Sequence, residues 1–311
     1  MDMSSPYKGR GFVLVMVLWL IALLTIIALG LSYNTRQSVR GVGALVGATQ
    51  ARYLAHGGVQ LALMNLLGER PEHRLLGDGE QLAVQLPNGS VNIAVFDESG
   101  KVGINTASPE LLSRLFEAFD MEERLADALA DAVVDYRDPD DLVSLNGAED
   151  DQYLAAGLPW EAKDSDFTRI EELQRVYGMP AWLYENILPY VTIHNIDRGI
   201  NPEVAPLPVL ISASDDSVYN LEAYIKGRRE NRILGLPLPA PPAVDRKFTA
   251  RARGTVFTII ATGWTSTGYH ASITTTVRVK RGGSNAAVET LDWIPYKLDA
   301  ATGSPQASGE L

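Results

Sequence analysis

The sequence predicts an α+β protein, with one long N-terminal helix and a small antiparallel sheet that a large helical insertion interrupts. Three observations predict this class. An apolar run at 12–31 continues as a helical pattern of apolar residues to about Leu67. Residues 81–97 and 248–280 alternate between apolar and polar side chains, as half-buried strands do. The segment between these two regions has the pattern of several short helices.

The apolar run from Phe12 to Leu31 is 20 residues long and carries no charge. A helix of that length spans about 30 Å, the thickness of the hydrocarbon core of a bilayer. Phe12, Met16, Trp19 and Leu31 are therefore expected to lie in the membrane. Lys8 and Arg10 precede the run and Arg36 and Arg40 follow it, so the distribution of positive charge does not fix its orientation.

Three interpretations of this run stay open at the level of the residues. It could be a secretory signal peptide with a small-residue cleavage site at 28–30, although its apolar core exceeds the usual length of about 7–15 residues. It could be a plain signal anchor. It could also follow a short basic leader, because Lys8-Gly9-Arg10-Gly11 ends in glycine directly before Phe12.

Turn and cap residues predict the elements of the body. A Pro87-Asn88-Gly89 turn between 81–86 and 90–97 predicts a β-hairpin. Ser108 and Pro109 are a typical N-cap and first helical residue. Helices are expected at 109–119, 122–136, 169–177, 181–192 and 218–229, and further strands at 248–253, 256–262 and 271–280. The residues after Gly282 are expected to form a loose tail.

The two pairs of helices predicted within 109–192 resemble helix-hairpin-helix units. Such hairpins bind DNA phosphates through backbone N–H groups and basic side chains. Here the first turn, 120–123, reads Asp-Met-Glu-Glu, which repels phosphate. The net charge of −11 also argues against nucleic-acid binding, which depends on Lys and Arg. Packing against protein is the favoured role of these hairpins.

Acidic residues are concentrated in one part of the chain. Residues 110–172 hold 19 Asp and Glu against 5 Lys and Arg. This density of oxygen ligands suits a hard cation such as calcium, although the spacing is not that of an EF-hand. Composition alone favours a solvated acidic loop over a cation site. The candidate ligands are Asp138, Asp140, Asp141, Glu149 and Asp150.

Nothing in the sequence indicates an enzyme. The chain has no cysteine, which excludes thiol nucleophiles and cysteine metal sites. Its four histidines, at 56, 73, 194 and 270, do not have a metal-binding spacing. Asp135 and Asp138 lie one helical turn apart, which favours a cap or cation role over acid–base catalysis.

The start of the chain resembles the type IV pilin-like proteins, whose leader ends in Gly before an apolar helix. The resemblance implies cleavage between Gly11 and Phe12 by a prepilin peptidase, N-methylation of Phe12, and a body in the periplasm. Most such proteins have Glu as the fifth mature residue, where this chain has Met16. A subunit with no neighbour above it has no partner for that carboxylate, so Met16 suits a topmost subunit.

Further motifs make the chain similar to one family, the K-type minor pseudopilins of type II secretion. They are Ile104-Asn105-Thr106-Ala107-Ser108-Pro109, Asp135-Tyr136-Arg137-Asp138-Pro139-Asp140-Asp141, Gly147-Ala148-Glu149-Asp150 and Glu171-Glu172-Leu173. The resemblance implies a non-enzymatic tip subunit of the pseudopilus, anchored in the bacterial inner membrane by a single helix. Its implied partners are the I- and J-type minor pseudopilins and, through them, the major pseudopilin. It also implies calcium at the five carboxylates, with no nucleic acid and no small-molecule substrate.

The resemblance divides the chain into six parts. They are a leader at 1–11, an assembly helix at 12–67, the first part of the sheet domain at 68–104, a helical insertion domain at 105–240, the second part of the sheet domain at 241–282, and a flexible tail at 283–311. The alternative function is that of a membrane-anchored periplasmic hydrolase that depends on a metal bound by the acidic loops.

Overall fold

The structure is a computed structural model, and it describes residues 10–68, 75, 77–250, 255–282 and 285–295. The helices are α1 (Arg10–Leu67), α2 (Pro109–Glu117), α3 (Glu123–Arg137), α4 (Asp150–Ala155), α5 (Ala181–Ile187), α6 (Leu207–Ala213) and α7 (Val218–Ile233). The strands are β1 (Asp78–Leu86), β2 (Gly89–Asp97), β3 (Val102–Gly103), β4 (Val191–Thr192), β5 (Val256–Thr265), β6 (His270–Gly282) and β7 (Asn285–Pro295). Short 3-10 turns lie at Glu98–Gly100, Ile170–Arg175, Leu188–Tyr190 and Arg246–Phe248.

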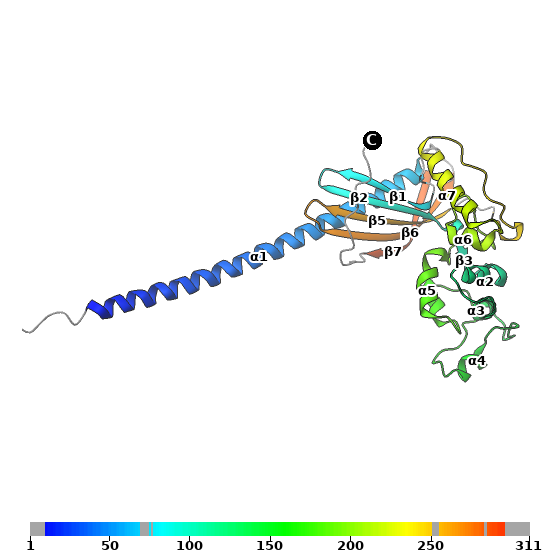
Figure 1. Cartoon of the computed structure of the whole chain (residues 1–311), viewed down its shortest axis with the longest axis horizontal. Coiled ribbons are helices and arrows are strands. Elements are labelled where there is room, and N and C mark those ends of the chain that lie inside the picture. Colours follow the sequence, from blue (N-terminus) through cyan, green and yellow to red (C-terminus); the bar gives the residue numbers. More distant parts are fainter. Residues whose placement is uncertain (1–9, 69–74, 76, 251–254, 283–284, 296–311) are drawn as a thin grey trace, which may run out of the picture.

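One helix of 58 residues, α1, determines the shape of the molecule. Figure 1 shows its N-terminal half projecting far beyond the sheet, while its C-terminal part lies on the sheet. The side chains at 12–33 are exposed, whereas Ala51, Ala55, Val59 and Leu66 are buried. The predicted helix that continues beyond the apolar run to about Leu67 is confirmed.

The main sheet has the strand order β1-β2-β5-β6-β7, and all its pairs are antiparallel. The segment 98–255 is inserted between β2 and β5, which are direct neighbours with Ile93 opposite Ala261. The predicted pairing of the strands before the insertion with those after it is therefore confirmed, as is the α+β class. Alternation along β2 turns Val91, Ile93 and Val95 towards α1.

Small residues let α1 approach the sheet closely. Gly263 on β5 lies so near the helix that a Cβ atom there would be 2.5 Å from the carbonyl oxygen of Ala51 and 2.6 Å from the backbone nitrogen of Ala55. Gly58 on the helix packs directly on Val91. Backbone contact at these points requires residues without bulky side chains on both elements.

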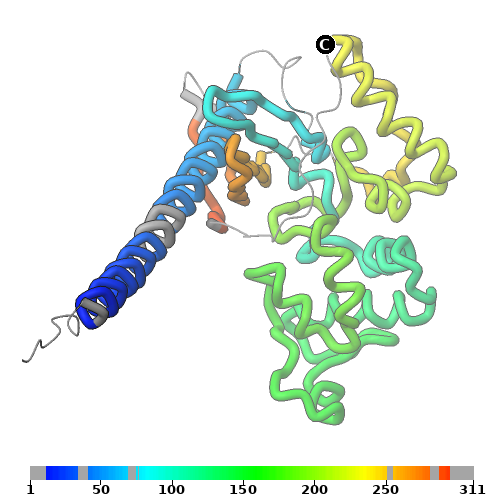
Figure 2. Tube along the Cα trace, turned by 60° about the vertical axis from the view of Figure 1, so that its left-hand side comes forward, coloured from blue at the N-terminus to red at the C-terminus, as the bar shows by residue number. Residues whose placement is uncertain are grey.

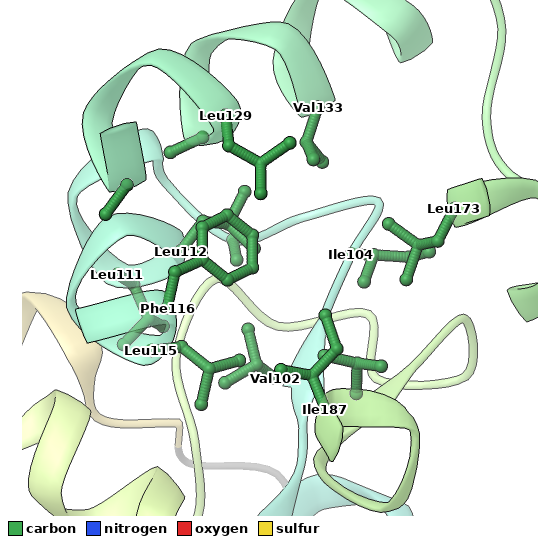
Figure 3. Close-up of a cluster of buried hydrophobic side chains, with 14 of the residues drawn as sticks. Val102, Ile104, Leu111, Leu112, Leu115, Phe116, Leu129, Val133, Leu173 and Ile187 are labelled. Carbon is green, nitrogen blue, oxygen red and sulfur yellow. The ribbon is translucent and has the colours of Figure 1, made fainter. Parts of the chain in front are cut away.

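The helical domain has a second hydrophobic core, separate from that of the sheet domain. Leu112 and Phe116 of α2 point towards Leu129 of α3, and Leu115 points towards Val102 (Figure 3). The short parallel pair of β3 and β4 joins the start of the domain to its later part. Figure 2 shows this domain beside the end of the sheet and away from the projecting half of α1.

Four segments differ from the sequence-based predictions. The predicted helix 169–177 is a 3-10 turn, and the helix expected to reach 192 ends at Ile187, just before Pro189, and gives way to β4. The expected strand 248–253 is also wrong in its described part, because Phe248 ends a 3-10 turn and is buried in the core of the helical domain. Residues 285–295, expected in a loose tail, pair with β6 as strand β7.

Candidate functional sites

The first candidate site is the apolar half of α1. Residues 12–33 form the one helical segment in the described part of the chain that is long and apolar enough to cross a membrane. Phe12, Met16, Trp19 and Leu31 are each about two-thirds or more exposed, so most of their side-chain surface is available to a membrane. Gly11 lies in the first turn of this helix. Residues 1–9, which hold most of the predicted leader, lie outside the described residues.

Beyond the membrane segment, α1 has an exposed apolar stripe on the side away from the sheet. Val42, Val46, Tyr53 and Met64 recur at helical spacing and are between 49% and 73% exposed. Gly57 lies on the same helix with open space around it, so the fold of this chain does not require a glycine there. The helix is therefore partnered by the sheet on one side only.

The second candidate site is a cluster of carboxylates at the C-terminal end of α3. Asp135 is fully buried there, and within the described residues its carboxylate accepts the backbone N–H of Ser144, at 3.1 and 3.3 Å. Gly147 packs directly on this carboxylate. The loop after α3 thus folds back over Asp135 and supplies a backbone donor to its carboxylate.

Glu149 and Asp138 lie close enough to Asp135 to feel its charge, and each has one buried oxygen without a hydrogen-bond partner in the described residues. Glu149 is 4% exposed, and within the described residues its Oε1 and the Oδ1 of Asp138 have no partner. Burial, together with Asp135, Asp138, Asp164 and Asp141, raises the pKa of Glu149 to about 7. Burial and the neighbouring Asp140 and Asp135 also raise the pKa of Asp138. These shifts have one physical cause, which is carboxylates crowded together away from water.

The five predicted ligands are therefore not equivalent. Glu149 is buried and Asp138 is half-buried with a buried Oδ1, and Asp141 lies near Glu149. Asp140 and Asp150 are exposed, and each accepts a backbone hydrogen bond, from Leu142 and Ala162 respectively. All five belong to one acidic region, but two of them already bind the loops around it.

Two members of the cluster were not among the predicted ligands. Asp135 shares a helix face with Asp138, and that spacing was the only sequence signal for it. Asp164 comes from a distant loop, where it has the left-handed φ of 54°. The backbone N–H groups of Lys163 and Asp164 donate to the carbonyl of Tyr136, and this brings the loop to the cluster. No local motif marks Asp164, because a tertiary contact places it.

The cluster has the chemistry of a hard-cation site but not a finished geometry. Unpartnered, buried carboxylate oxygens suit calcium, which takes six to eight oxygen ligands. Among the residues that the structure describes, no three acidic or histidine side chains converge tightly enough to form a complete ligand set. The residues fit a cation in charge and burial, with Asp135, Asp138 and Glu149 as the groups that would hold it and Asp141 and Asp164 beside them.

Comparisons with known proteins agree with this architecture. Residues 89–195 match the family model described as type II secretion system (T2SS), protein K. The type II secretion system protein K of Pectobacterium carotovorum subsp. carotovorum is 29% identical over 250 residues, which cover 71% of this chain and 76% of that protein. Its namesake from Pseudomonas aeruginosa is 27% identical over 241 residues, covering 70% and 72%. The crystal structure of the GspK-GspI-GspJ complex from the type 2 secretion system of enterotoxigenic Escherichia coli contains a chain with a TM-score of 0.52 at 19% identity, covering 83% of this chain and 99% of that one.

The fold is that of an α+β protein whose exposed N-terminal helix is long and apolar enough to anchor it in a membrane. The comparisons sharpen this class, because both relatives named above are called type II secretion system protein K and the solved complex includes GspK. The predicted resemblance to the K proteins of type II secretion is confirmed, because the chain matches that family model over residues 89–195 and is similar to such proteins over about 70% of its length. That family is a component of a secretion system and not a known class of enzyme.

Proposed function

We propose that this chain is the minor pseudopilin that forms the tip of a type II secretion pseudopilus. The observation that carries the proposal is the arrangement of α1 and the helical domain. An exposed apolar helix lies at one end of the molecule, and a bulky helical domain lies at the other (Figure 1). A subunit of this shape joins a helical filament through α1, while its helical domain covers the position above.

Met16 supports the topmost position. A carboxylate within an apolar span costs a few kcal/mol unless it has a partner. The exposed segment 12–33 holds no acidic residue, so this subunit requires no partner above it. The exposed stripe of Val42, Val46, Tyr53 and Met64 continues the same helix outside the bilayer and suits packing against helices of other minor pseudopilins, the I and J types.

Processing fits the same role. In this proposal a prepilin peptidase cuts between Gly11 and Phe12, Phe12 is N-methylated, and the inner membrane holds the subunit until it is drawn into the filament. The body then lies in the periplasm and takes part in protein export across the outer membrane. Mass spectrometry of the chain recovered from membranes, with Gly11→Ala as the comparison, identifies its N-terminus.

A calcium ion at the acidic cluster is the second part of the proposal. The support is the buried, unpartnered oxygen of Glu149 beside Asp135 and Asp138. A divalent cation supplies the positive charge that these groups lack, and it fixes the loops that carry them. Its role is structural, since it holds the outer surface of the helical domain in one shape.

Labelling of assembled pseudopili tests the tip position. The chain has no cysteine, so Leu154→Cys on the exposed helix α4 gives one attachment site for a gold label. Electron microscopy of overproduced pseudopili is expected to show gold at one end of each filament. Gold distributed along the filaments would overturn the tip proposal. Filaments of the cysteine-free chain, treated in the same way, control for non-specific labelling.

A further inference from the structure

The helical domain meets the sheet domain where the chain crosses between them. The backbone nitrogen of Asn201 donates to the carbonyl of Ser99 at 2.8 Å. Gly100 lies against the backbone of Val204 and Ala205, with no room for a side chain. This attachment lies next to the covalent crossing itself, so taken alone it acts as a pivot.

A second attachment lies on different elements and is built around Asp78, the first residue of β1. Asp78 has no exposed side-chain surface, which is unusual for a carboxylate at the start of an edge strand. Gly77 and Gly79 on either side both have a φ of 81°, and a side chain at Gly79 would run into the ring of Phe96. The two glycines allow the backbone to turn the Asp78 carboxylate away from water.

Two consecutive arginines of α7 converge on the Asp78 carboxylate. Its Oδ2 lies 3.2 Å from Nε and 3.1 Å from Nη2 of Arg228, and 2.9 Å from Nε of Arg229. Its Oδ1 accepts the backbone N–H of Glu80 at 3.1 Å. The Arg228 side chain has no exposed surface either, so the pair of Asp78 and Arg228 is completely removed from water.

Further contacts of α7 direct these arginines towards β1. Arg228 also lies within 3.4 Å of the carbonyl of Pro202, and its guanidinium lies 5.6 Å from the centre of the Tyr224 ring. Arg232, one turn further along, pairs with Glu80 at 3.3 Å. Because α7 packs on α6 and Tyr224 belongs to the core of the helical domain, these bonds connect that domain to the edge of the sheet.

We propose that Asp78 is a positioning residue, and that its pair with Arg228 is a brace that fixes the tilt of the helical domain on the sheet. A pivot at Ser99 and Asn201 leaves rotation free, whereas a second attachment on other elements stops it. An apolar contact at the second attachment would allow the helical domain to slide on the sheet domain. A buried ion pair does not, because any other tilt leaves both charges buried without partners.

The brace deepens the proposed function, because the tilt decides which surface the helical domain presents beyond the end of α1. The inference about tilt itself depends only on the geometry of the junction. A failure of the brace and a failure of the tip proposal therefore show in different experiments.

Distance measurement between two spin labels tests the brace. Labels at Gln85→Cys on β1 and Leu154→Cys on α4 report the position of one domain relative to the other in the full chain in detergent. With Asp78 present, a single narrow distance peak is expected. Asp78→Asn keeps the shape of the side chain but removes its charge, and loss of the narrow peak, by broadening or by a shift, is expected. Lys226→Gln removes a charge from an exposed pair on the same helix and is expected to leave the peak unchanged.

An unchanged narrow peak in Asp78→Asn overturns the brace. If that variant does not unfold cooperatively, Arg228→Lys decides instead, since it keeps the charge and loses the planar fork. Broadening in Arg228→Lys supports the brace, and an unchanged peak overturns it. A secretion assay on the same variants separates the two proposals. A changed distance with normal secretion keeps the brace and removes its role in function, and neither result alters where a gold label lies on a filament.

Discussion

At the scale of single residues, the acidic cluster is notable for the protonation of Glu149. A buried carboxyl with one unpartnered oxygen and four acidic neighbours holds its proton at a pH where exposed glutamates are charged. Its pKa of about 7, compared with 4.5 ordinarily, means that the folded chain binds this proton more tightly than the unfolded chain does. The shift therefore links the stability of the helical domain to pH.

The sign of this linkage predicts a loss of stability as the pH rises. Below about pH 4.5 Glu149 is protonated in both states and makes no difference. Between pH 4.5 and 7 the unfolded chain ionises first, so the free energy of unfolding falls, by about 3 kcal/mol in total at most. Above pH 7 the loss is complete.

Glu149→Gln, measured by urea unfolding in a chelator at pH 5 and pH 8, is expected to remove this part of the pH dependence. Glu161→Gln, at an exposed position in the same domain, is the control. Equal pH dependence in the wild type and in Glu149→Gln would contradict the assignment.

At the scale of elements, the contact of α1 with the sheet depends on where its small residues lie. Gly263 of β5 touches the helix backbone, whereas Gly57 on the helix has open space around it. The same substitution is therefore expected to act in opposite directions at the two positions. Gly263→Ala forces the helix and the sheet apart and is expected to lower the free energy of unfolding by about 1–3 kcal/mol. Gly57→Ala is expected to raise the free energy of unfolding by about 0.5–1 kcal/mol, because alanine favours the helix. Chemical unfolding of the full chain measures both, and a change of the same sign in the two variants would refute this packing.

The elements also show what the sequence can and cannot predict. Alternation of side chains predicted β1, β2, β5 and β6, of which β2, β5 and β6 each bury one face, and the long helix followed from its apolar period. Strand β7 was missed because it lies at the edge of the sheet and its residues 287–294 are exposed or half-buried, so no buried face marks it in the sequence. In the acidic site, composition pointed to the correct loops. It could not find Asp164, whose place depends on reciprocal hydrogen bonds between the side chain of Asn105 and the backbone of Phe167, 62 residues away.

At the scale of the whole molecule, two hydrophobic cores share one chain. The sheet core contains α1 residues such as Val59, and the core of the helical domain contains residues such as Phe116 and Tyr153. All members of the acidic cluster belong to the helical domain. Any cation that binds there stabilises this domain directly, because it binds the folded and not the unfolded form.

This division predicts that unfolding of the full chain takes place in two steps, of which calcium moves only one. Calcium at about 100 times its dissociation constant adds about 2.7 kcal/mol to the domain that binds it. Calorimetry in detergent, with chelator and then with calcium, is expected to raise the melting temperature of the helical domain and leave that of the sheet domain in place. Gly263→Ala assigns the two steps, because it weakens only the sheet domain. Glu149→Gln together with Asp138→Asn is expected to abolish the shift. A single transition, or a calcium shift that survives in the double variant, contradicts the placement of the cation, because the buried carboxylates that attract it all lie on one side of the junction.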